Sequence, residues 1–308
     1  MLDESLKPSD VLSIEQISEL KKKKEWKNIL SISSNWIQIV SALTLFYYFP
    51  HWSVFLFSLI VVGSRQFALA VLAHEGAHNL LFSNRKINDW CSQWFCAYPI
   101  FQDNRVYRPY HLKHHRFTET DEDPDLLLSA PFPITKLSFI RKIVRDLLGI
   151  TGFRRYKGTI KSIFKSNDPQ NKPGLDKLWY KLNGFLITNV IILLLITLFF
   201  HWSLFFLLWW LPSFTYYSLI IRIRNIAEHA VTEGDTAFNN TRTTKASFLI
   251  KFLIVPHNVN YHLEHHLFTR CPWYNLPQAH KMLLDAGYAD KMCLEDSYKS
   301  VLKAATNG

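Results

Sequence analysis

Residues 28–64 read NILSISSNWIQIVSALTLFYYFPHWSVFLFSLIVVGS, a run of 37 positions without Asp, Glu, Lys or Arg. A second uncharged run of 40 positions extends from Leu182 to Ile221. A bilayer-spanning helix needs about 20 apolar residues, so each run can form a hairpin of two helices. Core helices of a soluble protein are the alternative, but a chain of 308 residues has little interior in which to bury both runs. The sequence therefore predicts an all-α integral membrane protein with four spans, near 29–49, 52–73, 182–200 and 203–222.

The two runs contain similar internal turns, Pro50-His-Trp-Ser53 and Phe200-His-Trp-Ser203. Trp is typical of the membrane–water interface, so we expect His51 and His201 to lie there. Pro212 should kink the fourth span. We expect the second and fourth helices to continue beyond the bilayer and carry polar residues with them.

Lys and Arg residues predict the orientation. Lys21–Lys24 and Lys27 precede the first span, the 84–177 connection holds 17 Lys and Arg residues, and the short turns hold none. Cytoplasmic loops carry an excess of these residues. The sequence therefore predicts one domain over 1–308, with a cytoplasmic segment 1–28 and a cytosolic helical cap formed by 84–177 and 223–308. The bacterial inner membrane and the endoplasmic reticulum fit equally well.

The net charge of +10 indicates membrane lipids as partners and no nucleic acid, because the basic residues border the spans. The four cysteines, Cys91, Cys96, Cys271 and Cys293, have no paired metal-binding spacing. On a reducing cytoplasmic side they are expected to be free thiols.

Nine of the thirteen histidines fall into four clusters beside the apolar runs. Spacings of three and four residues place side chains on one face of a helix. Neutral imidazole binds iron, zinc or copper, and nine imidazoles exceed what one ion can hold, so the count predicts two metals. The clusters are His74 and His78; His111, His114 and His115; His229, which follows Asn225 by four residues; and His262, His265 and His266.

Carboxylates near the clusters are expected to orient the imidazole rings through their second nitrogens. The candidates are Glu75, Glu228, Glu264 and the acidic run Asp121–Asp125. Of the remaining histidines, we expect His257 to support the site or to bind metal, and His280 to lie on the surface.

His74-Glu75-Gly-Ala-His78 also matches His-Glu-x-x-His, the zinc-hydrolase motif in which Glu is the general base. An intramembrane zinc metalloprotease is therefore a remote alternative. It would leave two His-x-x-His-His clusters without a role.

The clusters resemble the histidine boxes of the membrane fatty acid desaturase superfamily, over roughly residues 60–285. Asn225-x-x-x-His229, Asp123-Pro-Asp125 and Pro272-Trp-Tyr-Asn-Leu-Pro277 are similar to further patterns of that family. The first box has three intervening residues where many acyl-CoA desaturases have four, a spacing also found in bacterial acyl-lipid desaturases and carotenoid oxygenases. The substrate carrier therefore stays open.

The resemblance implies four spans under a cytosolic cap that holds two iron ions, with a buried channel for an acyl chain. It implies an O2-dependent di-iron desaturase whose metal site is formed by the nine clustered histidines together with Asn225, which holds a water near iron. A hydroxylase or ketolase of the same superfamily, acting on a carotenoid, lipid or alkane, is the main alternative. A non-catalytic metal- or lipid-binding membrane protein is a further one.

Two electrons per turnover must come from outside the chain. The sequence contains no Rossmann glycine fingerprint, no His-Pro-Gly-Gly haem element and no Cys-x-x-Cys pair. We expect a separate donor of the ferredoxin, rubredoxin or cytochrome b5 type, which an acidic surface would guide to the basic cytoplasmic face.

Overall fold

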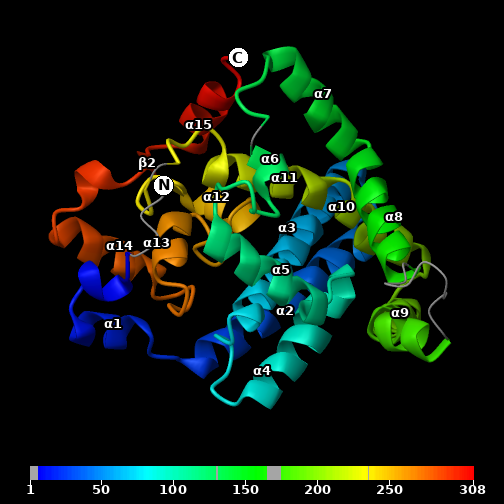
Figure 1. Ribbon diagram of the computed structural model, residues 1–308. Helices are drawn as coiled ribbons and strands as arrows, with labels where there is room; N and C mark the ends of the chain where they lie inside the picture. Colours follow the sequence, from blue (N-terminus) through cyan, green and yellow to red (C-terminus); the bar gives the residue numbers. More distant parts are fainter. Residues whose placement is uncertain (1–5, 130, 165–174, 235) are drawn as a thin grey trace.

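A computed structural model of the chain describes residues 6–129, 131–164, 175–234 and 236–308, which are mostly helical (Figure 1). The α-helices are α1 (Ile14–Leu20), α2 (Glu25–Tyr48), α3 (Trp52–Ala77), α4 (Arg85–Cys91), α5 (Asn104–Phe117), α6 (Leu126–Ser129), α7 (Lys136–Leu147), α8 (Ile150–Phe164), α9 (Leu175–Phe199), α10 (Leu211–Phe214), α11 (Tyr216–His229), α12 (Phe248–Leu253), α13 (His262–Leu267), α14 (Leu276–Asp285) and α15 (Tyr298–Ala305). Two π-helices, η2 (Ser92–Ala97) and η4 (Phe205–Trp210), and three 3-10 turns, η1 (Pro8–Asp10), η3 (Tyr98–Ile100) and η5 (Ala289–Lys291), complete the helical elements.

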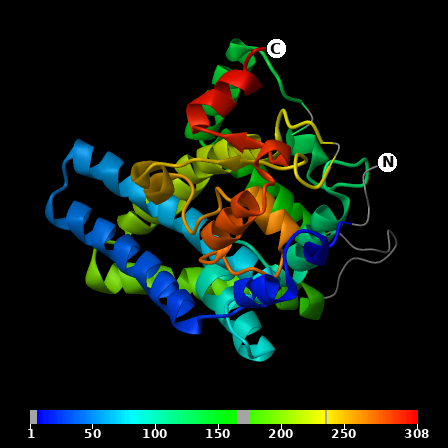
Figure 2. The ribbon, with the colours of Figure 1, turned by 90° about the vertical axis from the view of Figure 1, so that its left-hand side faces the viewer.

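Helices α2 and α3 form a hairpin that projects from the rest of the molecule, at the left of Figure 2. The buried Ser58 hydroxyl donates to the Ala42 carbonyl oxygen across it (2.9 Å). His51 accepts from the Ser53 amide and caps the start of α3, and His201 makes the same contact with Ser203 in the other turn. The repeated His-Trp-Ser sequence is thus a repeated capping turn, and both histidines are exposed.

Three helical segments in the described part of the chain are long and apolar enough to cross a membrane. They lie within Ile14–Tyr48, Trp52–Ala77 and Leu178–Phe199, and correspond to the first three predicted spans. The fourth predicted span, near 203–222, is not one continuous helix, because it is divided into η4, α10 and the start of α11. Pro212 lies in the first turn of α10, close to the predicted kink. Thr215, three residues later, has non-helical dihedrals (φ −101°, ψ −91°), which interrupt the series of backbone hydrogen bonds between α10 and α11.

The C-terminal end of α3, which carries His74, is held by contacts from the neighbouring helices. The last carbonyls of a helix lack intrahelical partners, and here side chains from neighbouring helices satisfy them. The Asn104 amide donates to the Ala73 carbonyl (2.8 Å), Asn88 to Gly76 (2.9 Å) and Arg108 to Ala77 (2.9 Å). These contacts fasten α4 and α5 to the end of α3.

Gly76 allows η2 to approach α3 closely. A Cβ at this position would lie 2.2 Å from the Ser92 Cβ, so no side chain fits. The glycine between the two histidines of the first cluster is therefore required by packing.

The C-terminal part of the chain closes over this end of the bundle. Helix α1 packs on α14 through an apolar cluster that includes Leu20, Leu276 and Leu283, and the Asn275 amide donates to the Leu20 carbonyl (2.9 Å). Two short parallel strands, β1 (Thr243–Thr244) and β2 (Leu294–Glu295), join the segment after α11 to the C-terminus.

We predict that Gly152→Ala destabilises the protein whereas Gly158→Ala does not. Both glycines lie on α8, but a Cβ at Gly152 would lie 2.4 Å from the Phe214 carbonyl oxygen, and one at Gly158 has no atom within 4 Å. Overpacking costs about 1–3 kcal/mol, whereas Ala in an open helix position is favoured over Gly by about 1 kcal/mol. Thermal unfolding in detergent measures both. Equal midpoints for the two variants would contradict the close approach of α8 to the helix break.

Candidate metal centre

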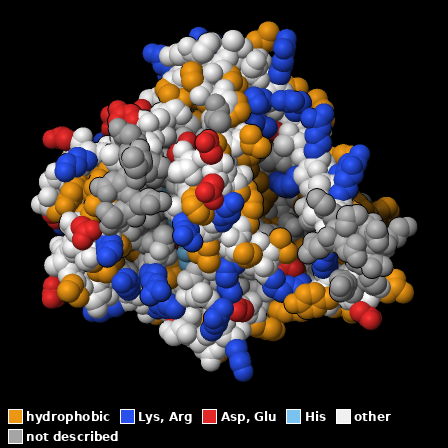
Figure 3. Space-filling model, in the orientation of Figure 1, with side chains coloured by type: hydrophobic (Ala, Val, Ile, Leu, Met, Phe, Trp, Pro, Cys, Tyr) orange, Lys and Arg blue, Asp and Glu red, His pale blue; other side chains and the backbone are white. Residues whose placement is uncertain are grey.

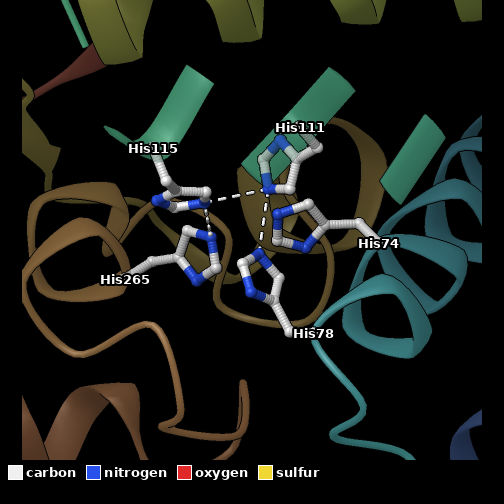
Figure 4. A group of neighbouring side chains, drawn as sticks. All are labelled: His74, His78, His111, His115 and His265. Atoms are coloured by element: carbon white, nitrogen blue, oxygen red, sulfur yellow. Dashed lines mark hydrogen bonds between the residues drawn. The ribbon is translucent and has the colours of Figure 1, made fainter. Parts of the chain in front are cut away.

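The nine clustered histidines converge in two groups. The first group comes from α3, its C-terminal cap, α5 and α13, and the second from α5, α11 and α13. Within each group the nearest ring nitrogens all lie within 4.8 Å of one another. The first group is His74, His78, His111, His115 and His265 (Figure 4), and the second is His114, His229, His262 and His266.

Helix periodicity explains how the residues divide. Residues four apart, such as His111 and His115, or His262 and His266, lie on one face and enter the same group. The middle residue of each triplet, His114 or His265, points to the other group. Each His-x-x-His-His cluster therefore contributes to both groups, so α5 and α13 each connect the two.

The ring nitrogens are too crowded to be explained by hydrogen bonds. The Nε2 of His111 lies 2.9 Å from the Nε2 atoms of both His78 and His115, as the dashed lines in Figure 4 show. A ring nitrogen has either one hydrogen or one lone pair, so it can form only one such bond. The Nε2 of His262 likewise faces two nitrogens, those of His229 (2.9 Å) and His266 (3.0 Å). A central cation would accept a lone pair from every ring.

The nitrogen separations also indicate a bond angle. Metal–imidazole bonds of about 2.1 Å place neighbouring nitrogens about 3.0 Å apart at right angles and about 3.4 Å apart at tetrahedral angles. The observed close pairs of 2.9–3.0 Å match right angles. The buried Nε2 of His74 has no hydrogen-bond partner and faces the same point. The first group also offers five nitrogen donors, one more than tetrahedral zinc takes, so it fits an ion with octahedral preferences better than zinc.

Burial lowers the pKa of most of these imidazoles and so favours the neutral form, which is the form that binds metal. It lowers the pKa of His78 to about 4, and it also lowers the pKa of His229. Burial is likewise the first cause, with neighbouring histidines the second, of pKa values well below the usual range for His111, His115, His262, His265 and His266.

Several imidazole rings make a contact through Nδ1, the ring nitrogen that faces away from the histidine group. The Nδ1–H of His114 donates to Asp123 (2.8 Å), and that of His266 lies 3.1 Å from the Thr118 hydroxyl. Glu75 lies 3.7 Å from the Nδ1 of His74. The predicted orienting role therefore agrees with the geometry for Asp123, whereas Asp121 and Glu122 are exposed and Glu75 lies beyond hydrogen-bond distance of His74.

Two features of this outer layer differ from the sequence prediction. Glu264 turns away from both groups and accepts from the Nδ1–H of His280 (2.6 Å). His280 is consequently part-buried, and its predicted surface position is wrong. Glu119, which sequence reasoning missed, lies 3.6 Å from the Nδ1 of His229 because its φ of +59° bends the chain after α5.

Glu228 and Asn225 lie on α11 beside the second group. Glu228 pairs with Arg224 and lies 3.5 Å from the Nε2 of His262, and burial raises its pKa to about 7. Asn225 lines a small polar cavity of about 30 Å³ together with His111, His114 and His229. A cavity of that size holds a water molecule.

His257 belongs to neither group. Its Nε2 lies 3.1 Å from the Asn35 amide of α2, and its ring packs on Trp273 (4.8 Å between centroids). The Trp273 amide in turn donates to Glu75 (2.9 Å), and its indole N–H donates to Asn28 (2.9 Å). The Pro-Trp-Tyr pattern therefore connects the loop after α13 to α2 and α3.

Comparison with known proteins agrees with this geometry. The sequence profile of the fatty acid desaturase family matches residues 50–294, a range that contains every candidate site residue. The chain belongs to the fatty acid desaturase family, which makes it an oxidoreductase of a membrane-bound superfamily. It is similar to the dihydrorhizobitoxine desaturase of Bradyrhizobium elkanii, with 26% identity over 267 residues that cover 82% of this chain and 74% of that protein.

Proposed function

We propose that the chain is an O2-dependent di-iron desaturase that introduces a double bond into a fatty acyl chain. The observation that carries the proposal is the pair of histidine groups, whose nitrogens crowd around two points at right-angle separations. The proposed ligands are the nine histidines of the two groups, with Asn225 holding a water beside the second. The zinc protease alternative is disfavoured, because the ligand set is larger than zinc needs.

Two irons with O2 would supply the oxidising power to remove two hydrogens from adjacent methylene carbons, which no side chain can do. O2, two electrons and two protons are consumed for each double bond, and two waters are released. The chain's own residues fix the imidazole rings of His114 and His266 through Asp123 and Thr118 and exclude bulk water by burial. The relative's name denotes a desaturase, which favours desaturation over hydroxylation or ketolation.

An apolar hollow offers space for a long substrate. It measures about 650 Å³ and is lined by side chains of α2, η2 and α9, among them Trp36, Trp94 and Ile192. Helix α4, which contributes Trp90 and Cys91 to the wall of this hollow, is also fastened to the C-terminal end of α3 by Asn88. We propose that the acyl chain enters from this side.

We further propose four membrane passes, with both termini and the metal centre cytoplasmic. Lys and Arg side chains are numerous on the face shown in Figure 3. The α2–α3 hairpin projects away from that face (Figure 2). This arrangement agrees with the excess of basic residues in cytoplasmic segments.

Metal content tests the ligand assignment. Purified protein should hold about two irons per chain, and His265→Ala and His266→Ala should each lower the iron content by removing one ligand from a different group. His201→Ala, in the exposed turn before η4, is the matched control and should retain both irons. Elemental analysis measures all four proteins. One zinc per chain, or full iron content in both group variants, would reject the assignment.

Product analysis tests the reaction. Expression in a host that supplies a ferredoxin and its reductase should give new double bonds in acyl chains, and His266→Ala should give none. Gas chromatography with mass spectrometry of total lipids measures both. Hydroxylated or ketolated products would overturn desaturation. New products only among non-acyl metabolites would overturn the acyl substrate.

Electron delivery has a candidate surface on α5. Lys113 and Arg116 are exposed on this helix, while its opposite side carries His111, His114 and His115. Helix α5 alone therefore lies between this exposed surface and the two histidine groups. We propose that an acidic one-electron carrier docks here.

The salt dependence of turnover tests this surface. The turnover rate of the wild type with a ferredoxin should fall steeply between about 50 and about 300 mM salt, and the rate of Lys113→Gln/Arg116→Gln should fall less steeply. Identical salt dependence in the two proteins would place the donor elsewhere.

A further inference from the structure

Helix α7 presents an apolar stripe to the outside. Its positions are spaced three or four residues apart and so share one helix face. All are well exposed, between 46% and 69%, and α8 continues the stripe with Phe153 at 62%. The stripe on α7 and the residue after it is Leu137, Ile140, Val144, Leu147 and Leu148. Large aliphatic side chains in such a row are costly to leave in water.

A cluster of cations adjoins the stripe. Arg222 of α11 donates to the fully buried Asp146 of α7 (2.9 Å from Nη2 to Oδ1), and Lys142 of α7 lies close enough to Arg145, Asp146 and Arg222 to interact with their charges. Burial, and then repulsion from Arg222 and Arg145, lowers the pKa of Lys142. The buried Nε of Arg145 has no hydrogen-bond partner among the described residues. Asp146 pairs with Arg222, whereas Lys142 and Arg145 have no ion-pair partner among the described residues, so two positive charges remain uncompensated.

Both features meet in one hollow of about 710 Å³ on the outer side of α7. Its wall combines Ser138, Arg141 and Arg145 with the apolar side chains of Ile140, Val144 and Leu148. A small soluble anion would use only the charges. A molecule with an anionic head and an apolar body would use the whole surface.

The position of α7 and α8 favours a bilayer lipid as that molecule. Helix α8 packs on α9, one of the segments long and apolar enough to span a membrane. Figure 1 shows α7 and α8 as a continuous ridge that leads to α9, and Figure 3 shows Lys and Arg side chains along the ridge. Amphipathic helices with basic edges lie in the plane of the membrane interface.

We propose that α7 and α8 lie along the bilayer surface and that the hollow on α7 binds the headgroup of an anionic phospholipid. The apolar stripe then faces the acyl region, and Lys142 and Arg145 neutralise the phosphate. This site is separate from the histidine groups and does not depend on the reaction proposed for them.

Native mass spectrometry of the full-length protein in detergent tests the proposal, with phosphatidylglycerol and phosphatidylcholine as probes. The wild type should bind phosphatidylglycerol more tightly than phosphatidylcholine. Lys142→Gln/Arg145→Gln should weaken phosphatidylglycerol binding on the order of 10- to 30-fold, since each basic residue near an anionic lipid contributes about 1 kcal/mol. Lys113→Gln/Arg116→Gln on α5 removes the same charge elsewhere and should leave binding within about twofold.

Three results would overturn the site: equal affinity for the two lipids, an equal loss in the α5 variant, or full displacement of the lipid by millimolar inorganic phosphate. The last would identify a free-anion site. If the double variant unfolds, Arg141→Gln serves in its place, because Arg141 is exposed and lines the hollow. It should weaken phosphatidylglycerol binding about fivefold, and unchanged binding in this variant would also overturn the site.

Discussion

Nine imidazoles, six of them buried and three part-buried, direct their ring nitrogens at two points, and the rest of the structure depends on that convergence. Without a cation, several of these nitrogens have no partner, and a buried polar group left unsatisfied costs about 1–3 kcal/mol. A bound cation would remove that cost for all of them together and would so contribute to folding. This requirement accounts for the polar residues Asn88, Asn104 and Arg108, which fix the end of α3 by binding its terminal carbonyls. An unsupported helix end would let His74 and His78 move relative to α5.

The division of each triplet between two groups has a physical consequence. Helices α5 and α13 each supply ligands to both groups, so neither group can shift without moving the other. The separation of the groups is thereby set by helix geometry, since His114 and His115 are adjacent residues with side chains about 100° apart around the axis. Two ions that act on one substrate need a fixed separation, and two rigid six- to fourteen-residue helices supply it more precisely than loops would.

Much of this could be predicted from the sequence because the signals are local. Two uncharged runs predicted apolar helices, and the four-residue spacings predicted pairs of histidines that share a face. The three-residue spacings did not, because His114 and His265 each enter the other group. The outer layer could not be predicted in the same way. Glu119 reaches His229 only because the chain takes a positive φ at that residue, and Glu264 pairs with His280 because α14 packs beside α13. Such contacts depend on tertiary packing between segments far apart in the sequence, which spacing does not encode.

The break in the fourth apolar segment shows how the site and the membrane-facing part constrain each other. An uninterrupted helix would continue in one direction, whereas α11 begins anew at Tyr216 and packs against α3, α7 and α8. A broken helix at membrane depth is tolerated only where the freed carbonyls find donors inside the protein. Here Thr215 donates to Leu211 (2.8 Å), Arg155 of α8 to Ser213 (2.8 Å), and Ser218 to Phe214 (2.9 Å). The break in the helix therefore explains why hydroxyl residues occur in an otherwise apolar run. The break itself lets α11 take a new direction, which brings His229 to the second histidine group.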